Sequence, residues 1–264
     1  MQERVLRDLS TRGLAFARYD ELGVSSSDWT RLRAIVDSFA ASERVREAIR
    51  RFPEEFARRE MRGDDYMVKL LPKNVTLPAD HPLVTIGLSS AVLDVVNRYL
   101  DLWAKLIYTD VWHTIPFDPG RRIGSQDWHR DPEDSTLVKV YMYFSNVDAT
   151  AGPLEYIPGS APGGPHAEVW PWKPRGERYP PAAELEQLLG DVERVSCLGT
   201  PGTVILCDTG GFHRGGIATE KPRIAATWTF VRPASAKVTS ERRFTVESSV
   251  DHTSLSPAAR FALS

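Results

Sequence analysis

The feature that most restricts the fold of this 264-residue chain is a change of sequence pattern after Trp103. Beyond that point the chain consists of short segments rich in β-branched and aromatic residues, separated by clusters of Gly, Pro and Asp, which is the pattern of strands and turns. The clearest strand candidates are KLIYTDVWHTI, TLVKVYMYFSNV, LEYI, ERVSCL, GTVILCD and RIAATWTFV. Strands joined by hairpins need no crossover helices, so the pattern predicts an antiparallel sandwich or barrel.

The first third of the chain has a helical pattern instead. Residues 26–62 are expected to be helical with a break at Pro53, and a helix after His81 has apolar residues that recur with helical period up to Trp103. The arginines of the first stretch alternate with glutamates, which is more typical of a solvated helix face than of a basic surface for RNA. Helices packed against a β-structure are therefore expected.

These patterns predict one domain that spans residues 1–264, mainly β with flanking α-helices, with a jelly roll as the favoured architecture. Within it, residues 1–103 provide mostly helical support and residues 104–231 form the jelly-roll core. An irregular insertion at residues 159–181 interrupts this core, and residues 232–264 form a C-terminal extension. Long ordered loops in compact domains are often functional, and a plain surface excursion is an equal alternative for the insertion.

Charge balance and cysteine content exclude several classes of protein. Lys and Arg total 33 against 35 Asp and Glu, and the isoelectric point is near 6.3, so no nucleic-acid partner is expected. Cys197 and Cys207 are too few for a disulfide framework and match no metal-binding spacing. Without a secretory signal or an apolar run of bilayer length, a cytoplasmic protein with no membrane partner is expected. The oligomeric state is not predicted.

Three residues have the composition of a non-haem iron site. His129 and Asp131 are two positions apart in SQDWHRDPED, so in extended backbone their side chains leave the same face while Arg130 points away. His213 lies in GTVILCDTGGFHRGG, where paired glycines permit tight backbone paths beside a site. Two imidazoles and one carboxylate form the facial triad that binds iron(II) and leaves other positions open. A zinc hydrolase would accept the same ligands.

An arginine downstream favours the first of these alternatives. Arg223 begins the segment RIAATWTFV ten residues after His213, and the turn-like GGIATEKP between them predicts that the two segments pair as a hairpin. Arg223 would then lie beside the metal ligand and present its planar guanidinium to a carboxylate. A dicarboxylate cosubstrate could thus bind the metal at one end and the arginine at the other.

The combination of motifs resembles the phytanoyl-CoA dioxygenase family of iron(II)- and 2-oxoglutarate-dependent oxygenases. The matching pieces are QDWHRDPED, VKVYMYFSNVD followed by AGPLEYIPGS, and GTVILCDTGGFHRGG followed by KPRIAATW, which together cover roughly residues 104–231. The resemblance implies a cupin-like double-stranded β-helix and an iron(II) ion bound by His129, Asp131 and His213. It also implies that Arg223 binds the distal carboxylate of 2-oxoglutarate and that O2 is the second cosubstrate.

Two departures from relatives bear on the chemistry. Where many relatives continue Pro-Gly-Ser-His, this chain has Ala161 after Ser160, which leaves the iron triad untouched. A related halogenating group replaces the metal-binding acid by a small residue, whereas Asp131 is retained here. The resemblance therefore implies hydroxylation or another oxidation without halide.

Further residues are candidates for the cosubstrate site. Gln126 precedes the first histidine by three residues and resembles a glutamine that contacts 2-oxoglutarate in some relatives, with an ordinary loop amide as the alternative. Lys139, Tyr141 and Tyr143 alternate onto one face of their strand. If that face lines the barrel, Lys139 and Tyr141 approach the cosubstrate. The alternative is an outer face covered by helices.

Candidate substrate contacts are Trp112 and Trp128, as aromatic walls, and Tyr66 and Lys69, which can reach over the barrel mouth. By resemblance, the expected function is hydroxylation of an aliphatic C–H in a small molecule of secondary metabolism, with decarboxylation of 2-oxoglutarate to succinate. Desaturation, cyclisation and epimerisation are not distinguished from it by sequence. The alternatives are a metal-dependent jelly-roll hydrolase or isomerase that does not use 2-oxoglutarate, and a ligand-binding barrel with a vestigial metal site.

Overall fold

A computed structural model describes residues 2–118, 120–173, 177–240, 242–247 and 255–264. Small parts of the predicted insertion, at 174–176, and of the predicted C-terminal extension, at 241 and 248–254, lie outside the described residues. The elements in chain order are α1 (Gln2–Arg12), β1 (Leu14–Arg18), α2 (Ser26–Ala40), α3 (Glu43–Arg58), β2 (Met67–Lys69), β3 (Val75–Leu77), α4 (Pro82–Gly87), α5 (Ser90–Leu100), β4 (Lys105–Thr114), η1 (Gly124–Gln126), β5 (Leu137–Tyr143), β6 (Leu154–Tyr156), α6 (Ala182–Leu189), β7 (Val195–Cys197), β8 (Thr203–Asp208), β9 (His213–Gly215), β10 (Ile224–Val231), α7 (Lys237–Ser240), β11 (Phe244–Val246) and α8 (Pro257–Leu263).

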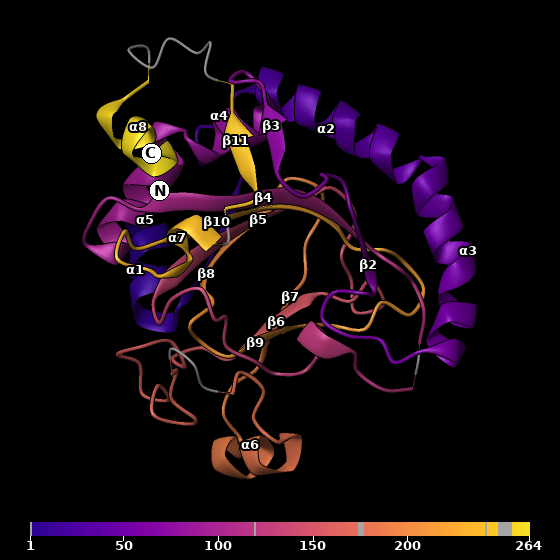
Figure 1. The fold of residues 1–264 in the computed structure, drawn as a ribbon. Coiled ribbons are helices and arrows are strands. Elements are labelled where there is room, and N and C mark those ends of the chain that lie inside the picture. The colour runs from indigo at the N-terminus through magenta and orange to yellow at the C-terminus, as the bar shows by residue number, and fades with distance from the viewer. Residues whose placement is uncertain (1, 119, 174–176, 241, 248–254) are drawn as a thin grey trace.

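Two antiparallel sheets form the centre of the fold (Figure 1). The major sheet has six strands in the order β1-β8-β5-β10-β4-β2, and the minor sheet has three in the order β7-β6-β9. Neighbouring strands are often far apart in sequence, since β10 lies between β5 and β4. Two further strands, β11 and β3, pair in parallel outside these sheets. The expected jelly-roll, cupin-like fold with flanking helices is confirmed.

Alternation along β5 separates the two faces of the major sheet. Val138, Val140 and Met142 belong to the large apolar core that also contains the helix residues. Lys139 and Tyr141 leave the opposite face and line a cavity inside the jelly roll. Successive side chains of a strand point to opposite faces, so a strand that is buried on both sides still divides an apolar side from a polar one. The polar face of β5 is therefore the inner face.

The N-terminal helices flank the major sheet (Figure 1). α2 begins after Ser25, whose hydroxyl accepts a hydrogen bond from the Asp28 N–H, and packs into the core through Leu32. The expected break at Pro53 is wrong, because α3 runs through this residue without interruption. Pro53 lies on the exposed face of the helix, where water can bond the carbonyl that loses its intrahelical donor, so the helix continues.

The single helix expected after His81 is also wrong, because the structure has two. His81 Nδ1 accepts from the Leu83 N–H at the start of α4, and the Ser89 hydroxyl accepts at the start of α5. Each N-cap residue satisfies a free donor of a helix start, so two caps define two helices. Trp103, expected at the end of the buried stripe, lies beyond α5 and is 48% exposed.

The first third of the chain contributes an edge strand that the sequence did not suggest. β1 pairs with β8 along its whole length, from Leu14 opposite Cys207 to Arg18 opposite Thr203. These bonds attach the N-terminal region to the major sheet directly rather than through helix packing alone. The division of the chain at residue 103 stays a prediction.

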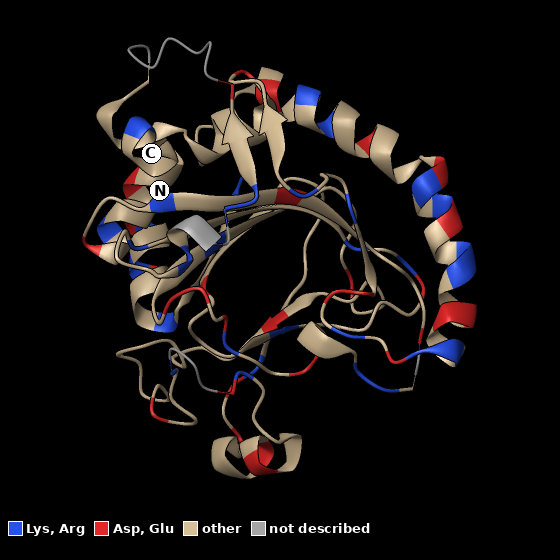
Figure 2. Cartoon of the chain, in the orientation of Figure 1, with Lys and Arg blue, Asp and Glu red and all other residues tan. Residues whose placement is uncertain are grey.

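The outer surface of α3 carries charges of both signs (Figure 2). Arg46, Arg50, Arg51 and Arg58 each pair with a glutamate three or four residues away on the same helix. The stretch is therefore a solvated helix face with internal pairs. Among the described residues, no helix combines the length and the apolarity that a membrane crossing requires.

Candidate active site

Backbone pairing brings the two candidate histidines together although they are distant in sequence. His129 and His213 form an antiparallel bridge in which each N–H donates to the carbonyl of the other at 3.1 Å. His213 begins β9, which pairs with β6, and the Asp131 N–H donates to the Thr209 carbonyl. Main-chain hydrogen bonds thus hold the three predicted metal ligands at one place in the fold.

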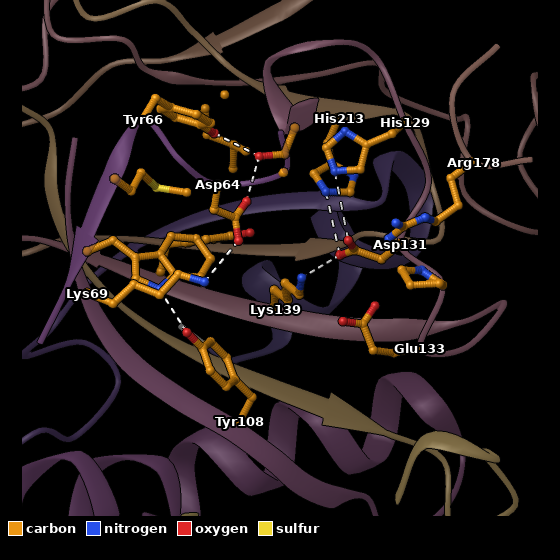
Figure 3. A pocket seen from close by; sticks show the side chains of 18 of the residues that line it. Asp64, Tyr66, Lys69, Tyr108, His129, Asp131, Glu133, Lys139, Arg178 and His213 are labelled. Atoms are coloured by element: carbon orange, nitrogen blue, oxygen red, sulfur yellow. Dashed lines mark hydrogen bonds and ion pairs between the residues drawn. The ribbon is translucent and has the colours of Figure 1, made fainter. Parts of the chain in front are cut away.

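Both imidazoles turn the same nitrogen toward the aspartate (Figure 3). His129 Nδ1 lies 2.8 Å from the Asp127 carbonyl, and His213 Nδ1 lies 3.1 Å from the Gly211 carbonyl. A carbonyl only accepts, so each Nδ1 carries the proton and each Nε2 keeps a lone pair for a metal. The two Nε2 atoms lie 3.8 and 3.5 Å from carboxylate oxygens of Asp131, and the three donor atoms lie within 4.8 Å of one another.

Burial sets the protonation of these side chains. His129 and His213 are 5% and 4% exposed, and burial lowers the pKa of both, that of His213 to about 3, so both imidazoles are neutral at pH 7. Burial alone would raise the pKa of Asp131, but interactions with Lys139 and the two histidines hold it well below its usual range. Neutral imidazoles and an ionised carboxylate are the forms that bind a metal.

Lys139 faces the same carboxylate from β5. Its ammonium lies 2.6 Å from Asp131 Oδ2. Burial alone would lower the pKa of Lys139, but the attraction of Asp131 keeps it well above the ordinary value, so the lysine is charged. The pair gives the buried carboxylate the positive partner that it needs and places an ammonium beside any anion that binds at the triad.

The expected hairpin between the segments of His213 and Arg223 is wrong. β9 pairs with β6 in the minor sheet, whereas β10, which follows Arg223, pairs with β4 and β5 in the major sheet. The connecting segment is held elsewhere, through a bridge between Ala218 and Ala151. This bridge leads the chain from one sheet to the other, so the two residues approach from different sheets rather than along a hairpin.

Arg223 nevertheless reaches the same cavity as the triad. It is 6% exposed, and a Cβ placed on Gly215, two residues after His213, would lie 3.6 Å from Arg223 Nη2. Its Nη1 atom is buried and has no hydrogen-bond partner among the described residues. A buried cationic donor without an acceptor is unfavourable by itself, so this guanidinium is suited to an anion that enters the cavity.

The cavity has a volume of about 240 Å³ and brings together most of the residues singled out by sequence (Figure 3). Lys139 and Tyr141 line it from β5, and Tyr66, Lys69 and Trp112 line it from β4 and the segment that contains β2. Lys69 lies across the cavity from the two histidines. The metal ligands, three of the four candidate cosubstrate residues and three of the four candidate substrate contacts therefore share one space.

Gln126 and Trp128 are not among the residues that line this cavity. The amide oxygen of Gln126 accepts from the Ile123 N–H at 3.0 Å and stabilises the short helix η1. Trp128 packs with Phe212 in a separate apolar cluster, and the Arg214 guanidinium lies over its ring. Both residues are close to His129 in sequence, but their side chains have structural partners away from the triad.

The cavity wall that carries Tyr66 and Lys69 also contains Asp64 and Ser125, which were not predicted from the sequence. Asp64 accepts from Lys69 Nζ at 2.9 Å and from Ser125 Oγ at 2.8 Å, and Ser125 Oγ lies 2.9 Å from the Tyr66 hydroxyl. This hydrogen-bonded series lies opposite the triad (Figure 3). Its sequence signal is the segment DDYMVK, in which Asp64 lies five residues before Lys69.

The described part of the insertion also contributes to the site. Arg178 and Tyr179 line the cavity, and the Tyr179 ring lies 5.3 Å from the His129 ring. Trp172 donates from Nε1 to the Asp131 carbonyl at 2.8 Å. Of the two interpretations of this loop, the contacts support the functional one. The length of the loop was one sequence signal for this role, but which of its side chains turn inward depends on tertiary packing.

Arg130, between the first two ligands, points away from the cavity and holds the insertion in place. It is buried, and its guanidinium stacks over Phe212 at 4.1 Å. A guanidinium has five N–H donors, and here they meet five main-chain carbonyls. The carbonyls belong to Ser160, Ala167, Val169, Trp170 and Gly210. One side chain thus connects the His-x-Asp segment, the insertion and the loop before His213.

Replacing Arg130 by methionine should lower the free energy of unfolding by about 2–5 kcal/mol, because buried carbonyls lose their donor. The same change should expose residues 161–172 to limited proteolysis. Arg130→Lys is the matched control, since it keeps the charge but has only three donors, and should give an intermediate loss. Denaturant unfolding and proteolysis measure both effects. Unfolding curves of the methionine variant that superimpose on the wild type would contradict the role.

The donor set fits a metal ion on its own chemistry. Two neutral imidazole nitrogens and one carboxylate, all buried and mutually close, are the ligands of a facial iron(II) site. A jelly roll with this triad is an arrangement that non-haem iron oxygenases have. The chain belongs to the phytanoyl-CoA dioxygenase (PhyH) family, whose model matches residues 30–225. The resemblance inferred from the motifs is thereby confirmed. No curated protein matches the chain by sequence.

Solved structures with the same fold include several enzymes. EctD from S. alaskensis, with 2-oxoglutarate and 5-hydroxyectoine, is 18% identical with a TM-score of 0.56, over 87% of this chain and 76% of EctD. The epimerase SnoN, in complex with Fe3+, alpha-ketoglutarate and nogalamycin RO, is 15% identical with a TM-score of 0.53, over 87% and 83% of the two chains. AviO1 from Streptomyces viridochromogenes Tue57 is 14% identical with a TM-score of 0.53, over 89% and 96%. At these identities the likeness concerns the fold.

Proposed function

We propose that this protein is an iron(II)- and 2-oxoglutarate-dependent dioxygenase that hydroxylates an aliphatic C–H of a small molecule. In the balanced reaction, the substrate C–H, 2-oxoglutarate and O2 give the alcohol, succinate and carbon dioxide. One oxygen atom enters the alcohol and the other enters succinate. Bound iron(II) supplies the redox chemistry that O2 requires.

The triad supports this proposal through its geometry and its protonation. His129, Asp131 and His213 would hold the ion from one side, which leaves positions for the cosubstrates. Their main-chain bonds and the two Nδ1 contacts fix the ligands in advance. Lys139, charged and 2.6 Å from Asp131, and Tyr141 beside it on β5 would face the part of 2-oxoglutarate nearest the metal.

The observation that carries the proposal is the buried guanidinium of Arg223 in the same cavity as the triad. Its unpartnered Nη1 matches the need for an anion, and a planar guanidinium suits a carboxylate. In our proposal the distal carboxylate of 2-oxoglutarate binds there. A metal-dependent hydrolase or isomerase that does not use 2-oxoglutarate has no need of a second anion site at this position.

The proposed setting is a small-molecule pathway of secondary metabolism in the cytoplasm. SnoN, a solved structure with the same fold, is described as an epimerase from nogalamycin biosynthesis. The two cysteines of the chain are buried and unpaired, which suits a reducing compartment. Tyr66, Lys69 and Trp112, on the cavity wall, are the proposed substrate contacts.

The proposal is tested first by the binding of iron(II) and 2-oxoglutarate and then by turnover. Under anaerobic conditions the protein should bind about one iron(II) per chain and then 2-oxoglutarate, with little 2-oxoglutarate binding when the metal is absent, because the keto acid then has no metal to chelate. On addition of O2 the complex should release succinate. With a true substrate and 18O2, one labelled atom should enter the product. Metal binding without affinity for 2-oxoglutarate would favour the hydrolase or isomerase, and an unlabelled oxidised product would exclude hydroxylation.

A further inference from the structure

Basic side chains outnumber acidic ones on the wall of the cavity. The basic lining residues are Lys69, Lys139, Arg178, Arg223 and Arg243, and the acidic ones are Asp64, Asp131 and Glu133. In the proposed function the charges of iron(II) and of the 2-oxoglutarate dianion cancel. The cavity that remains for the substrate therefore keeps a positive excess, which favours an anionic substrate over a neutral or cationic one.

Several of these basic groups already have an assigned partner. Lys69 pairs with Asp64 at 2.9 Å and Lys139 pairs with Asp131 at 2.6 Å. Arg223 is assigned to the distal carboxylate of 2-oxoglutarate in the proposed function. These pairs neutralise the wall opposite the triad and the floor beside it, and leave two arginines: Arg243, whose guanidinium lies over the Tyr108 ring at 5.2 Å, and Arg178 from the insertion.

Arg178 is the guanidinium that the insertion supplies to the cavity wall, and the residue is also exposed to solvent. It lies on the side of the cavity that carries Asp131 and is directed inward (Figure 3). In the part of the chain that the structure describes, it makes no ion pair with an acidic side chain, and its only ring contact is with Tyr179 next to it. Its backbone is anchored, because the Arg178 carbonyl accepts from the Arg130 N–H. A fixed backbone with an unpaired planar cation at the cavity wall is an arrangement that binds carboxylate or phosphate oxygens.

Two aromatic rings of β4 also line the cavity. Tyr108 and Trp112 lie together on β4, with the Trp112 Nε1 donating to the Tyr108 hydroxyl at 3.0 Å. Such rings offer apolar surface to the body of a substrate, although Lys69 lies over the Trp112 ring at 5.7 Å and Arg243 over the Tyr108 ring at 5.2 Å. The volume of about 240 Å³ must also hold the metal and 2-oxoglutarate, and it is below the roughly 300–1,000 Å³ of sites for drug-sized ligands, so only a very small molecule or one end of a larger one fits inside.

We infer that the substrate of this enzyme carries an anionic group, a carboxylate or a phosphate, that binds Arg178, and an apolar part that contacts Tyr108 and Trp112. The inference rests on the proposed function, because the metal and 2-oxoglutarate must occupy the triad and Arg223 for the remaining space to be the substrate site. Arg178 is then a specificity-determining residue supplied by the insertion. A molecule with the same apolar part but a neutral amide in place of the acidic group should bind much more weakly.

The test uses crystals of the wild-type protein loaded with Mn(II) and 2-oxoglutarate and soaked in bromide. Anomalous diffraction should show bromide on the Arg178 guanidinium, stronger than on Arg7, whose side chain is 68% exposed on α1 and which serves as the surface control. Competing acetate or inorganic phosphate should displace the bromide, and whichever does so at lower concentration identifies the acid class. Arg178→Gln should lose the bromide peak, whereas Arg7→Gln should keep it.

Every other outcome has a defined meaning. Equal peaks at Arg178 and Arg7, or a peak that persists in Arg178→Gln, mean an adventitious ion only and overturn the inference, as does the absence of any peak. If Arg178→Gln weakens 2-oxoglutarate binding by about tenfold or more, the residue belongs to the cosubstrate and the inference is also overturned. If neither Mn(II) nor 2-oxoglutarate binds the wild type, the proposed function itself fails.

Discussion

His213→Ala is expected to abolish turnover and to weaken metal binding by more than about 100-fold, because changes that merely reorient a ligand already cost 10–100-fold. The variant loses one of only two imidazole donors, and no other histidine is part of the cluster within the described residues. The fold should persist, since the bridge between residues 129 and 213 is made by main-chain atoms. Iron content after anaerobic loading, with a thermal unfolding curve, measures both parts.

His166→Ala is the matched control for this change. His166 lies in the insertion and makes no contribution to the triad, so its alanine variant should load iron like the wild type. A His213→Ala protein that binds iron with wild-type affinity would show that the metal lies elsewhere. A variant that fails to fold would be identified by its unfolding curve and replaced by His213→Gln, which keeps more of the buried volume.

Arg223→Gln is expected to weaken 2-oxoglutarate binding to the iron-loaded protein by about 2–3 kcal/mol, or roughly 30–150-fold, because a charge-assisted contact to a carboxylate is lost. Metal affinity in the absence of 2-oxoglutarate should not change, since Arg223 is not a ligand. The protein without 2-oxoglutarate should be at least as stable as the wild type, because the variant no longer buries an unpaired charge. Calorimetric titration and denaturant unfolding measure these effects.

Arg223→Lys separates the role of charge from that of shape. An ammonium keeps the charge but not the planar fork, so its affinity for 2-oxoglutarate should lie between those of the glutamine variant and the wild type. Equal 2-oxoglutarate affinity in Arg223→Gln and the wild type would refute the assignment of this residue. It would also remove the main argument against a metal-dependent hydrolase.

The parts of the site that sequence predicted were those with local or motif-level signals. The two-residue spacing of His129 and Asp131 correctly placed Arg130 on the opposite side, because strand geometry is local. The alternation on β5 separated Lys139 and Tyr141 from the apolar face in the same way. Which of the two faces lies inside the barrel depends on packing between sheets, so the pattern left that question open.

What sequence could not predict depends on contacts between distant segments. The position of Arg223 beside the triad was predicted from a hairpin that the structure does not contain. Arg223 reaches the cavity because the chain crosses from the minor to the major sheet. Gln126 has the spacing of a cosubstrate contact, but a local hydrogen bond to Ile123 directs its amide elsewhere. Arg178 lies in an irregular loop with no period, and its backbone is held by a hydrogen bond from the Arg130 N–H to the Arg178 carbonyl.

Iron-edge anomalous diffraction from crystals grown without oxygen in the presence of iron(II) and 2-oxoglutarate tests the central claim most directly. The account predicts one iron peak bonded to Nε2 of His129, Nε2 of His213 and a carboxylate oxygen of Asp131, with 2-oxoglutarate extending from it to the Arg223 guanidinium. An iron peak away from these three side chains, or a bound 2-oxoglutarate that leaves Arg223 without a carboxylate, would contradict it.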